Sequence, residues 1–323
     1  MIEKRKLIVK DEQGMPNYMT AFFWNGEKDP AQVPPMFVVR GEVMDAVLVS
    51  QFHNTNVNGI PCSLPFREPW TSISLDDAAS ACRKKGKGWH LLTNQEYAFL
   101  LKESRALGTE PHGNTDCGRD YDHPEEKGVT YDGRMTLSGL DPVTWSHDHT
   151  EGGVYGLKGN VWELVQGLRL ACGAVQYIKD NDAAAAATDT STASQEWVQA
   201  VTEDGRPVKL SADGAGVVIT TGKVRDRWDW CNMEDVALAD DLERVPQVLY
   251  DLEILPPDWE KRQDGIYVDS ELEEVVPFRG SGFSLAALGG VSAVFLYHPR
   301  SGVDVGVGFR SALYLKDRKL ITE

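Results

Sequence analysis

Basic side chains are in short supply in this sequence. Lys and Arg number 33 against 49 Asp and Glu, which gives a formal net charge of −16 at pH 7. A surface of that sign repels the phosphate groups of nucleic acids and of anionic lipids. The composition therefore argues against nucleic acids and membrane surfaces as partners.

Cysteines are few and do not form recognisable pairs. The five are Cys62, Cys82, Cys117, Cys172 and Cys231, and no C-x-x-C motif occurs. This scattered spacing indicates neither a zinc knuckle nor a disulfide framework. We expect free, mostly buried thiols.

Long apolar runs are also missing. Met1–Lys10 has a basic start but no apolar stretch of the kind that a signal peptide requires. Residues 280–299 lack Asp, Glu, Lys and Arg, yet they include four glycines, three serines and His298. We therefore expect neither a signal peptide nor a membrane span.

The chain does contain enough material for a folded protein. It has 323 residues, of which 41% are hydrophobic, so it can bury a sizeable core. Its 30 glycines and 16 prolines favour turns and loops. Residues 1–60, with strand candidates at 36–39 and 43–49, are predicted to form a strand-rich N-terminal lead-in.

Two helices have clear local signals. Ser74 can cap a helix over about residues 75–85, which Gly86 then ends. Thr93 and Glu96 form a capping box at the start of a second helix, because each side chain can satisfy a free backbone N–H group. An α+β fold is expected.

Other segments are less regular. Residues 108–153 are crowded with Gly, Asp, Asn and His, and predict a long, ordered loop. Residues 180–194, with a run of five alanines, have low complexity and lead into a predicted short helix over 195–201. Alternating residues over 203–221 predict hairpins.

The histidines offer one possible metal pair. His147 and His149 have an i, i+2 spacing that could hold a metal from a strand, but no second conventional ligand set is obvious. A hydrogen-bonded structural role is the preferred interpretation, and no metal site is predicted.

Three motifs carry a family resemblance. They are Gly88-Trp-His-Leu-Leu-Thr-Asn-Gln-Glu-Tyr97, Gly153-Val-Tyr-Gly-Leu-Lys-Gly-Asn-Val-Trp-Glu163, and the run from Phe278-Arg-Gly-Ser-Gly-Phe283 to Gly308-Phe-Arg310. Their order and spacing resemble those of the formylglycine-generating enzyme family. The resemblance implies a loop-rich α+β fold of the C-type lectin type over residues 61–323, with an insertion at about 172–226.

The motif residues are expected to act as scaffold. Asn160 and Glu163 are suited to satisfying buried backbone groups, since an amide and a carboxylate each offer several hydrogen bonds. The structural set comprises Trp89, Asn160, Trp162, Glu163, Arg279, Arg300, Phe309 and Arg310.

The resemblance does not carry over the catalytic residues. The family's copper-binding cysteine pair aligns with Leu285 and Gly290, and no cysteine follows Cys231. Oxidase chemistry would therefore lack its thiolate ligands. We expect no enzyme activity and no cofactor.

The C-terminal run has a second resemblance. Residues 282–310 resemble the variable region of proteins diversified by retroelements, in which a reverse transcriptase copies a template with random substitution at adenines. Val291, Ala293 and Leu296 are expected to face the core, while residues between them are displayed. The display residues are expected to be Phe283, Ser284, Leu285, Ala287, Leu288, Phe295, Tyr297, His298, Gly302, Val303, Asp304, Val305 and Gly306.

The composition of residues 283–306 agrees with this mechanism. An asparagine codon randomised at both adenines never encodes Trp, Gln, Lys, Glu or Met. These five types make up 64 of the 323 residues, yet none occurs in residues 283–306. Chance alone would produce this on the order of once in two hundred windows of average composition. A buried strand would also exclude charge, but Ser284, His298, Arg300 and Asp304 are not typical of one.

The sequence thus predicts a binding protein with a hypervariable surface, such as a phage receptor-binding protein at the tail tip or a bacterial surface-recognition protein. Its expected partner is a cell-surface or other macromolecular ligand, and a reverse transcriptase with its accessory protein would act on its gene. Two alternatives remain: an oxidative enzyme of the formylglycine-generating type, and a lectin of fixed specificity.

Overall fold

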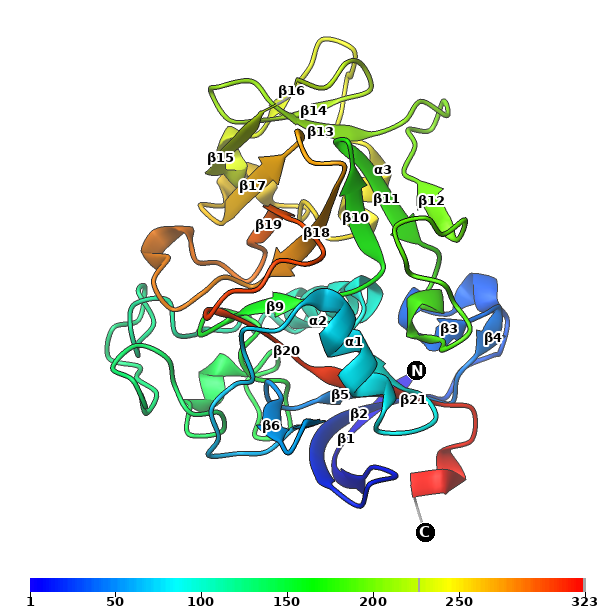
Figure 1. The fold of residues 1–323 in the computed structure, drawn as a ribbon, viewed down its shortest axis with the longest axis vertical. Coiled ribbons are helices and arrows are strands. Elements are labelled where there is room, and N and C mark those ends of the chain that lie inside the picture. Colours follow the sequence, from blue (N-terminus) through cyan, green and yellow to red (C-terminus); the bar gives the residue numbers. More distant parts are fainter. Residues whose placement is uncertain (226, 322–323) are drawn as a thin grey trace.

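The computed structural model describes residues 1–225 and 227–321, and most of its regular secondary structure is β (Figure 1). The helices in these residues are α1 (Leu75–Arg83), α2 (Asn94–Leu107) and α3 (Gln247–Asp251). None of these is long and apolar enough to cross a bilayer. The chain is a mostly β, loop-rich protein with few helices, which is compatible with the predicted α+β class.

One sheet brings the two ends of the chain together. Its order is β1-β2-β5-β21-β8, formed by β1 (Ile2–Lys10), β2 (Pro16–Trp24), β5 (Ala46–Ser50), β21 (Ser311–Leu315) and β8 (Trp89–Leu91). The C-terminal strand β21 lies antiparallel between β5 and β8. The N-terminal strands therefore belong to the same sheet as the C-terminal strand, in the lower part of Figure 1.

The second sheet has twelve strands, and of the strands after residue 160 in the described part of the chain only β21 lies outside it. Its main path runs β15-β17-β19-β18-β10-β11-β13-β14-β16, with β9, β12 and β20 paired to its members. The strands are β9 (Trp162–Leu164), β10 (Leu168–Ala171), β11 (Ala174–Ile178), β12 (Trp197–Gln199), β13 (Lys209–Ala212), β14 (Val217–Thr220), β15 (Trp228–Asn232), β16 (Ala237–Leu238), β17 (Gly265–Asp269), β18 (Glu274–Arg279), β19 (Val294–His298) and β20 (Val307–Phe309). Its largest core cluster packs residues of β10, β13, β14, β17 and β19 against α3.

Two ribbons and several single-turn helices complete the fold. The ribbons pair β3 (Val38–Val39) with β4 (Glu42–Val43), and β6 (Thr55–Val57) with β7 (Ile60–Cys62). The 3₁₀ turns are η1 (Pro30–Gln32), η2 (Pro35–Phe37), η3 (Val143–Trp145), η4 (Asp182–Ala184), η5 (Met233–Asp235), η6 (Trp259–Lys261), η7 (Ala286–Leu288) and η8 (Arg318–Ile321).

Both predicted helices are confirmed, including their capping. The Ser74 hydroxyl accepts the Asp77 N–H at 3.2 Å, and Thr93 and Glu96 form the complete capping box. The low-complexity segment contributes to this second cap. Its Asn181 is buried, accepts the Thr93 hydroxyl at 2.6 Å and donates to the Glu96 carboxylate at 2.9 Å. The segment is therefore anchored to the start of α2.

Several other predictions were confirmed or corrected. The hairpin predicted over 203–221 is formed by β13 and β14. The loop predicted over 108–153 follows the end of α2, and η3 is the one helix or strand within it. All five cysteines are free and three of them are buried. The helix predicted over 195–201 is wrong, because this segment forms β12 on the edge of β11. A short helix is costly to nucleate, whereas residues 197–199 can pair directly with the edge of β11.

The predicted strand over 36–39 is only partly correct. Pro34 and Pro35 lead into the 3₁₀ turn η2, so only Val38–Val39 is extended. The second candidate, over 43–49, is divided between β4 and β5. Proline fixes its own φ and removes a donor, which favours a turn where a strand would need N–H groups.

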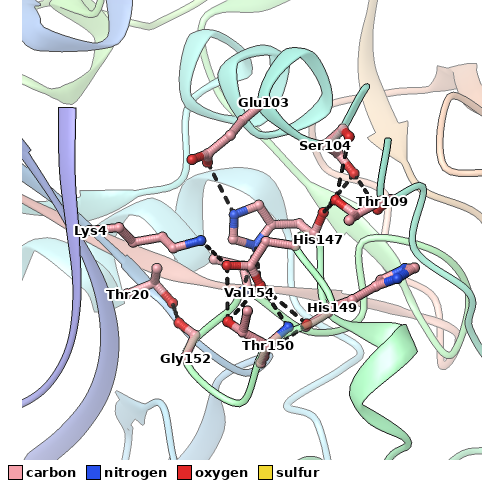
Figure 2. A network of polar contacts seen from close by, with 12 residues as sticks. Lys4, Thr20, Glu103, Ser104, Thr109, His147, His149, Thr150, Gly152 and Val154 are labelled. Atoms are coloured by element: carbon pink, nitrogen blue, oxygen red, sulfur yellow. Dashed lines mark hydrogen bonds and ion pairs between the residues drawn. The ribbon is translucent and has the colours of Figure 1, made fainter. Parts of the chain in front are cut away.

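A polar network fastens the long loop to the rest of the protein (Figure 2). The His147 Nδ1 accepts the Val154 N–H at 2.8 Å, and its Nε2 lies 3.1 Å from the Glu103 carboxylate on α2. Lys4 of β1 forms an ion pair with Asp148. Both ring nitrogens of His147 thus have protein partners, which confirms the predicted hydrogen-bonded role.

The buried capping box yields a stability prediction. Thr93→Ala removes the hydroxyl that serves both the Glu96 N–H and Asn181, and should lower the free energy of unfolding by about 1–2 kcal/mol. Urea denaturation measures the loss. Gln13→Ala, an exposed position, serves as the control, and a Thr93→Ala loss no larger than that of the control would contradict the assigned role.

Candidate functional site

The segment 280–306 is a long excursion whose two ends meet at one short strand. It leaves β18 at Arg279, which lies opposite Glu163 of β9. It returns at Val307 in β20, which lies opposite Trp162 of the same strand. The Trp162 N–H also donates to the Gly306 carbonyl at 2.8 Å. The three residues of β9 therefore fix both ends of the predicted variable segment.

A buried ion pair completes this junction. The Glu163 carboxylate accepts the Arg310 Nε–H at 2.5 Å, and both side chains are fully enclosed. Arg310 also donates to the Ser50 carbonyl at 3.2 Å. Burial raises the pKa of Glu163 although Arg310 opposes this, and burial lowers the pKa of the neighbouring His53 well below its ordinary value. His53 is therefore neutral near pH 7, and Arg310 is the cation that pairs with Glu163.

Asn160 acts as the predicted clamp on backbone groups. Its side-chain oxygen accepts the Thr136 N–H at 2.7 Å, and its side-chain nitrogen donates to the Thr136 carbonyl at 3.2 Å. Its own backbone has φ +67°, a left-handed conformation that Asn tolerates better than most residues. Asn160 thereby connects the long loop to the start of β9.

Two further scaffold groups hold the base of the segment. The buried Arg279 guanidinium donates to the Glu253 carbonyl at 2.6 Å and lies over the Tyr97 ring, 4.9 Å from its centre. The Tyr97 hydroxyl lies 3.1 Å from the Val291 carbonyl, to which it can donate. A helix residue thus fixes the backbone of a position that was predicted to face the core.

Arg300 anchors the far turn of the segment. Its guanidinium donates to Glu274 of β18 at 2.9 and 3.1 Å, to Asp76 of α1 at 2.8 Å and to the Thr190 carbonyl at 2.9 Å. Burial raises the pKa of Glu274, but hydrogen bonds from Arg300, Thr192 and Arg169 outweigh it and lower this pKa to about 2. The turn after β19 is therefore joined to three separate parts of the scaffold.

The segment itself separates buried and displayed side chains. Val291, Ala293 and Leu296 are buried, as predicted, and Val294 is also at 0% exposure. On the other face of β19, Phe295 packs on Trp162 with ring centres 4.1 Å apart, and its ring centre lies 5.6 Å from that of Tyr297. Alternation along β19 thus places these two aromatics on the face opposite Val294 and Leu296, where Phe295 still packs against a second core cluster.

Several of the predicted display residues lie next to one another. Phe295 and Leu288 both border Gly265, and a Cβ atom added there would lie within 3.7 Å of each. Gly306 borders Asp304 and the Phe283 ring in the same way. Ser284, Ala287, Val303, Asp304 and Val305 are exposed, while Phe283, Leu285, Leu288, Phe295, Tyr297, His298 and Gly302 are partly buried.

One display residue is buried, contrary to the expectation. Gly306 is buried, because its N–H donates to Asp304 at 2.7 Å and its carbonyl accepts from β9, so the expectation that it is displayed is wrong. His298 is half-buried, since its ring stacks on the core residue Phe278 at 4.3 Å. Trp89, by contrast, lies in the other sheet, where its ring covers the buried Lys85 ammonium at 4.1 Å.

The long loop over 108–153 forms hydrogen bonds with the backbone of the segment. The Cys117 N–H donates to the Phe283 carbonyl at 2.7 Å, and the Arg134 guanidinium lies 5.2 Å from the centre of the Phe283 ring. The Ala286 N–H donates to the Thr115 carbonyl at 2.9 Å. The segment is therefore also held at Phe283 and Ala286, a few residues after it leaves β18.

Sequence reasoning missed an aromatic extension of this surface. Tyr267 of β17 lies opposite Phe295, and its ring centre is 4.4 Å from that of Tyr297. Trp228 of β15 stacks on Tyr267 at 5.6 Å. The Trp-Asp-Trp pattern at 228–230 was the available signal, since alternation places both indoles on one face of a strand.

Among residues 1–225 and 227–321, no group of three or more His, Cys, Asp or Glu side chains is arranged to hold a metal ion. No known protein family matches the chain, and no curated protein is significantly similar to it.

The buried pair at β9 should dominate the stability of this junction. Glu163→Gln leaves the Arg310 charge buried without a counter-charge and should lower the free energy of unfolding by about 3–5 kcal/mol. The matched control is Glu203→Gln, whose exposed pair with Arg244 should contribute less than about 1 kcal/mol. Chemical denaturation compares them, and equal losses would contradict the role of the junction.

Glu274 should make stability depend on pH in the acid range. Its pKa is about 2 in the folded protein against an ordinary value of 4.5. The ionised carboxylate therefore stabilises the fold above pH 4.5, and this stabilisation is lost as the pH falls toward 2. The difference in unfolding free energy between the parent and Glu274→Gln should shrink over that interval.

Denaturation curves at several pH values test this, with the exposed Glu271→Gln as the control. A difference between the parent and Glu274→Gln that stays constant from pH 5 to pH 2 would show that the carboxylate is not stabilised by its partners.

Proposed function

We propose that the protein binds macromolecular ligands through residues 283–306, a variable surface on a scaffold of the C-type lectin type. The observation that carries this proposal is the junction at β9, which fixes both ends of the segment while most display residues remain at least partly exposed. Specificity can then change without rebuilding the fold, because substitutions at exposed sites usually cost little stability.

The source of variation in this proposal is a diversity-generating retroelement. The absence of Trp, Gln, Lys, Glu and Met from residues 283–306 supports it. The segregation of side chains supports it too, since Val291, Ala293, Val294 and Leu296 are buried and hydrophobic while their neighbours differ in size and polarity. A reverse transcriptase and its accessory protein would act on the gene.

The aromatic side chains suit a recognition role. Phe295 and Tyr297 are rigid, partly exposed, and backed by Trp162 and Tyr267. Aromatic anchors near the centre of an interface contribute most of its binding energy. The proposed ligand is a molecule on a cell surface, with the protein placed at a phage tail tip or on a bacterium.

A library experiment tests the proposal. Random substitution of Ser284, Ala287, Val303, Asp304 and Val305 should give proteins that still unfold cooperatively within a few degrees of the parent. Selection of this library against an arbitrary protein, such as hen egg-white lysozyme, should yield binders. Returning a selected binder to the parent residues should abolish its binding.

The matched library randomises Val291, Ala293, Val294 and Leu296, and most of its members should fail to fold. The proposal is overturned if the exposed-site library unfolds as often as the buried-site library, or if it yields folded proteins but no binders.

A further inference from the structure

Two tryptophans next to the variable segment are unusually open to solvent. Trp228 is 55% exposed and Trp230 is 47% exposed, although both lie in strand β15. Large aromatic side chains left at a surface commonly mark an interaction site. Neither residue belongs to segment 283–306, so the proposed diversification would leave both unchanged.

The sheet places these indoles on the same face as the variable aromatics. Trp230 lies opposite Tyr267, and Tyr267 lies opposite Phe295 in β19. Directly opposed residues share a face, as do residues i and i+2 of one strand. We call the set Trp228, Trp230, Tyr267, Phe295 and Tyr297 the aromatic face. Strands β15, β17 and β19 are neighbours in the sheet (Figure 1).

Two carboxylates border the aromatic face without a cationic partner. Asp269 lies opposite Trp228, and one of its oxygens accepts the Glu271 N–H. One oxygen of Asp304 accepts the Gly306 N–H. Within the described part of the chain, neither carboxylate forms an ion pair. Burial lowers the pKa of the nearby His298, so this ring is neutral at pH 7 and does not offset them.

We propose that the aromatic face binds an arginine or lysine side chain of the partner protein, with Trp228, Trp230 and Asp269 as the constant part of the site. This inference rests on the proposed recognition function and names the ligand chemistry at its edge. A guanidinium can stack on an indole and pair with a carboxylate at once. The net charge of −16 attracts such a partner at long range.

The constant tryptophans and the variable residues would have different functions in this site. A basic side chain is common on protein surfaces, so a fixed subsite for it can serve many partners. The variable residues Phe295, Tyr297 and Asp304 then contact whatever surrounds that side chain. One invariant contact would thus orient each new ligand on the segment.

Peptide binding by the full chain tests the proposal. The probe is a hexa-arginine peptide, and its control is hexa-citrulline, which has nearly the same shape but no charge. The readout is the shift of the Trp228 and Trp230 indole N–H signals in nuclear magnetic resonance spectra, assigned with single Trp→Phe variants. The dissociation constant obtained from these shifts should be at least tenfold lower for hexa-arginine than for hexa-citrulline.

Matched variants separate this site from general attraction to an acidic protein. Trp228→Ala with Trp230→Ala, or Asp269→Asn, should weaken hexa-arginine binding at least fivefold. Isothermal titration calorimetry measures this for every variant, because the double Trp variant lacks both indole signals. Phe66→Ala and Asp240→Asn, which alter an exposed aromatic and an exposed carboxylate elsewhere, should change it less than twofold. Melting curves verify that each variant is folded.

The proposal is overturned if hexa-citrulline binds as well, if the control variants weaken binding equally, or if a neutral oligosaccharide such as cellohexaose shifts the two indoles while hexa-arginine does not. The library selection uses different residues and a different target. If the peptide titration fails, the proposed function still stands. If the library selection fails, the peptide titration is still a valid measurement of the aromatic face.

Discussion

The pairing of β18 and β20 with the single strand β9 is the constraint on which the proposed surface depends. A segment of more than twenty residues with little regular structure has many conformations, and closing it at one place removes much of that freedom. Hydrogen bonds of β9 supply the closure, and the buried Glu163–Arg310 pair adds a charge contact beside it. Because both groups are enclosed, loss of either leaves an uncompensated charge. The motif that contains Asn160, Trp162 and Glu163 thus has a structural role, because it closes the ends of the segment.

The same construction would allow the proposed recognition surface to vary at little cost in stability. The buried positions of the segment belong to three core clusters, and the Val291 carbonyl also lies within hydrogen-bond distance of the Tyr97 hydroxyl, while Ser284, Ala287, Val303 and Val305 are exposed. Partly buried aromatics lie between these extremes. Phe295 contributes to packing through Trp162 and to the surface through Tyr297, so its replacement affects both. In the proposed function, recognition would therefore also use side chains that contribute to folding.

The sequence was most informative where structure depends on neighbours along the chain. Ser74 and the Thr93–Glu96 box predicted α1 and α2, because capping is a contact over three residues. Strand pairing joins distant segments, so the sequence around 195–201 did not reveal that β12 pairs with β11. For the same reason, the exposure of Trp228 could not be derived from its neighbours along the chain. The display set was predicted from a template pattern, and Gly306 departs from it because β9 binds its carbonyl. The Glu163–Arg310 partnership, separated by most of the C-terminal half, had no local signal.

The central claim is that natural variation is confined to the displayed positions of one segment. Deep sequencing of many natural copies of this gene, together with the DNA that follows it, measures this directly. The account predicts substitutions concentrated at the codons of residues such as Ser284, Tyr297, Val303 and Val305, with Val291 and Leu296 constant, and a downstream near-repeat carrying adenines at the varying codons. Substitutions spread evenly along the chain, or frequent at the buried positions of β19, would contradict it.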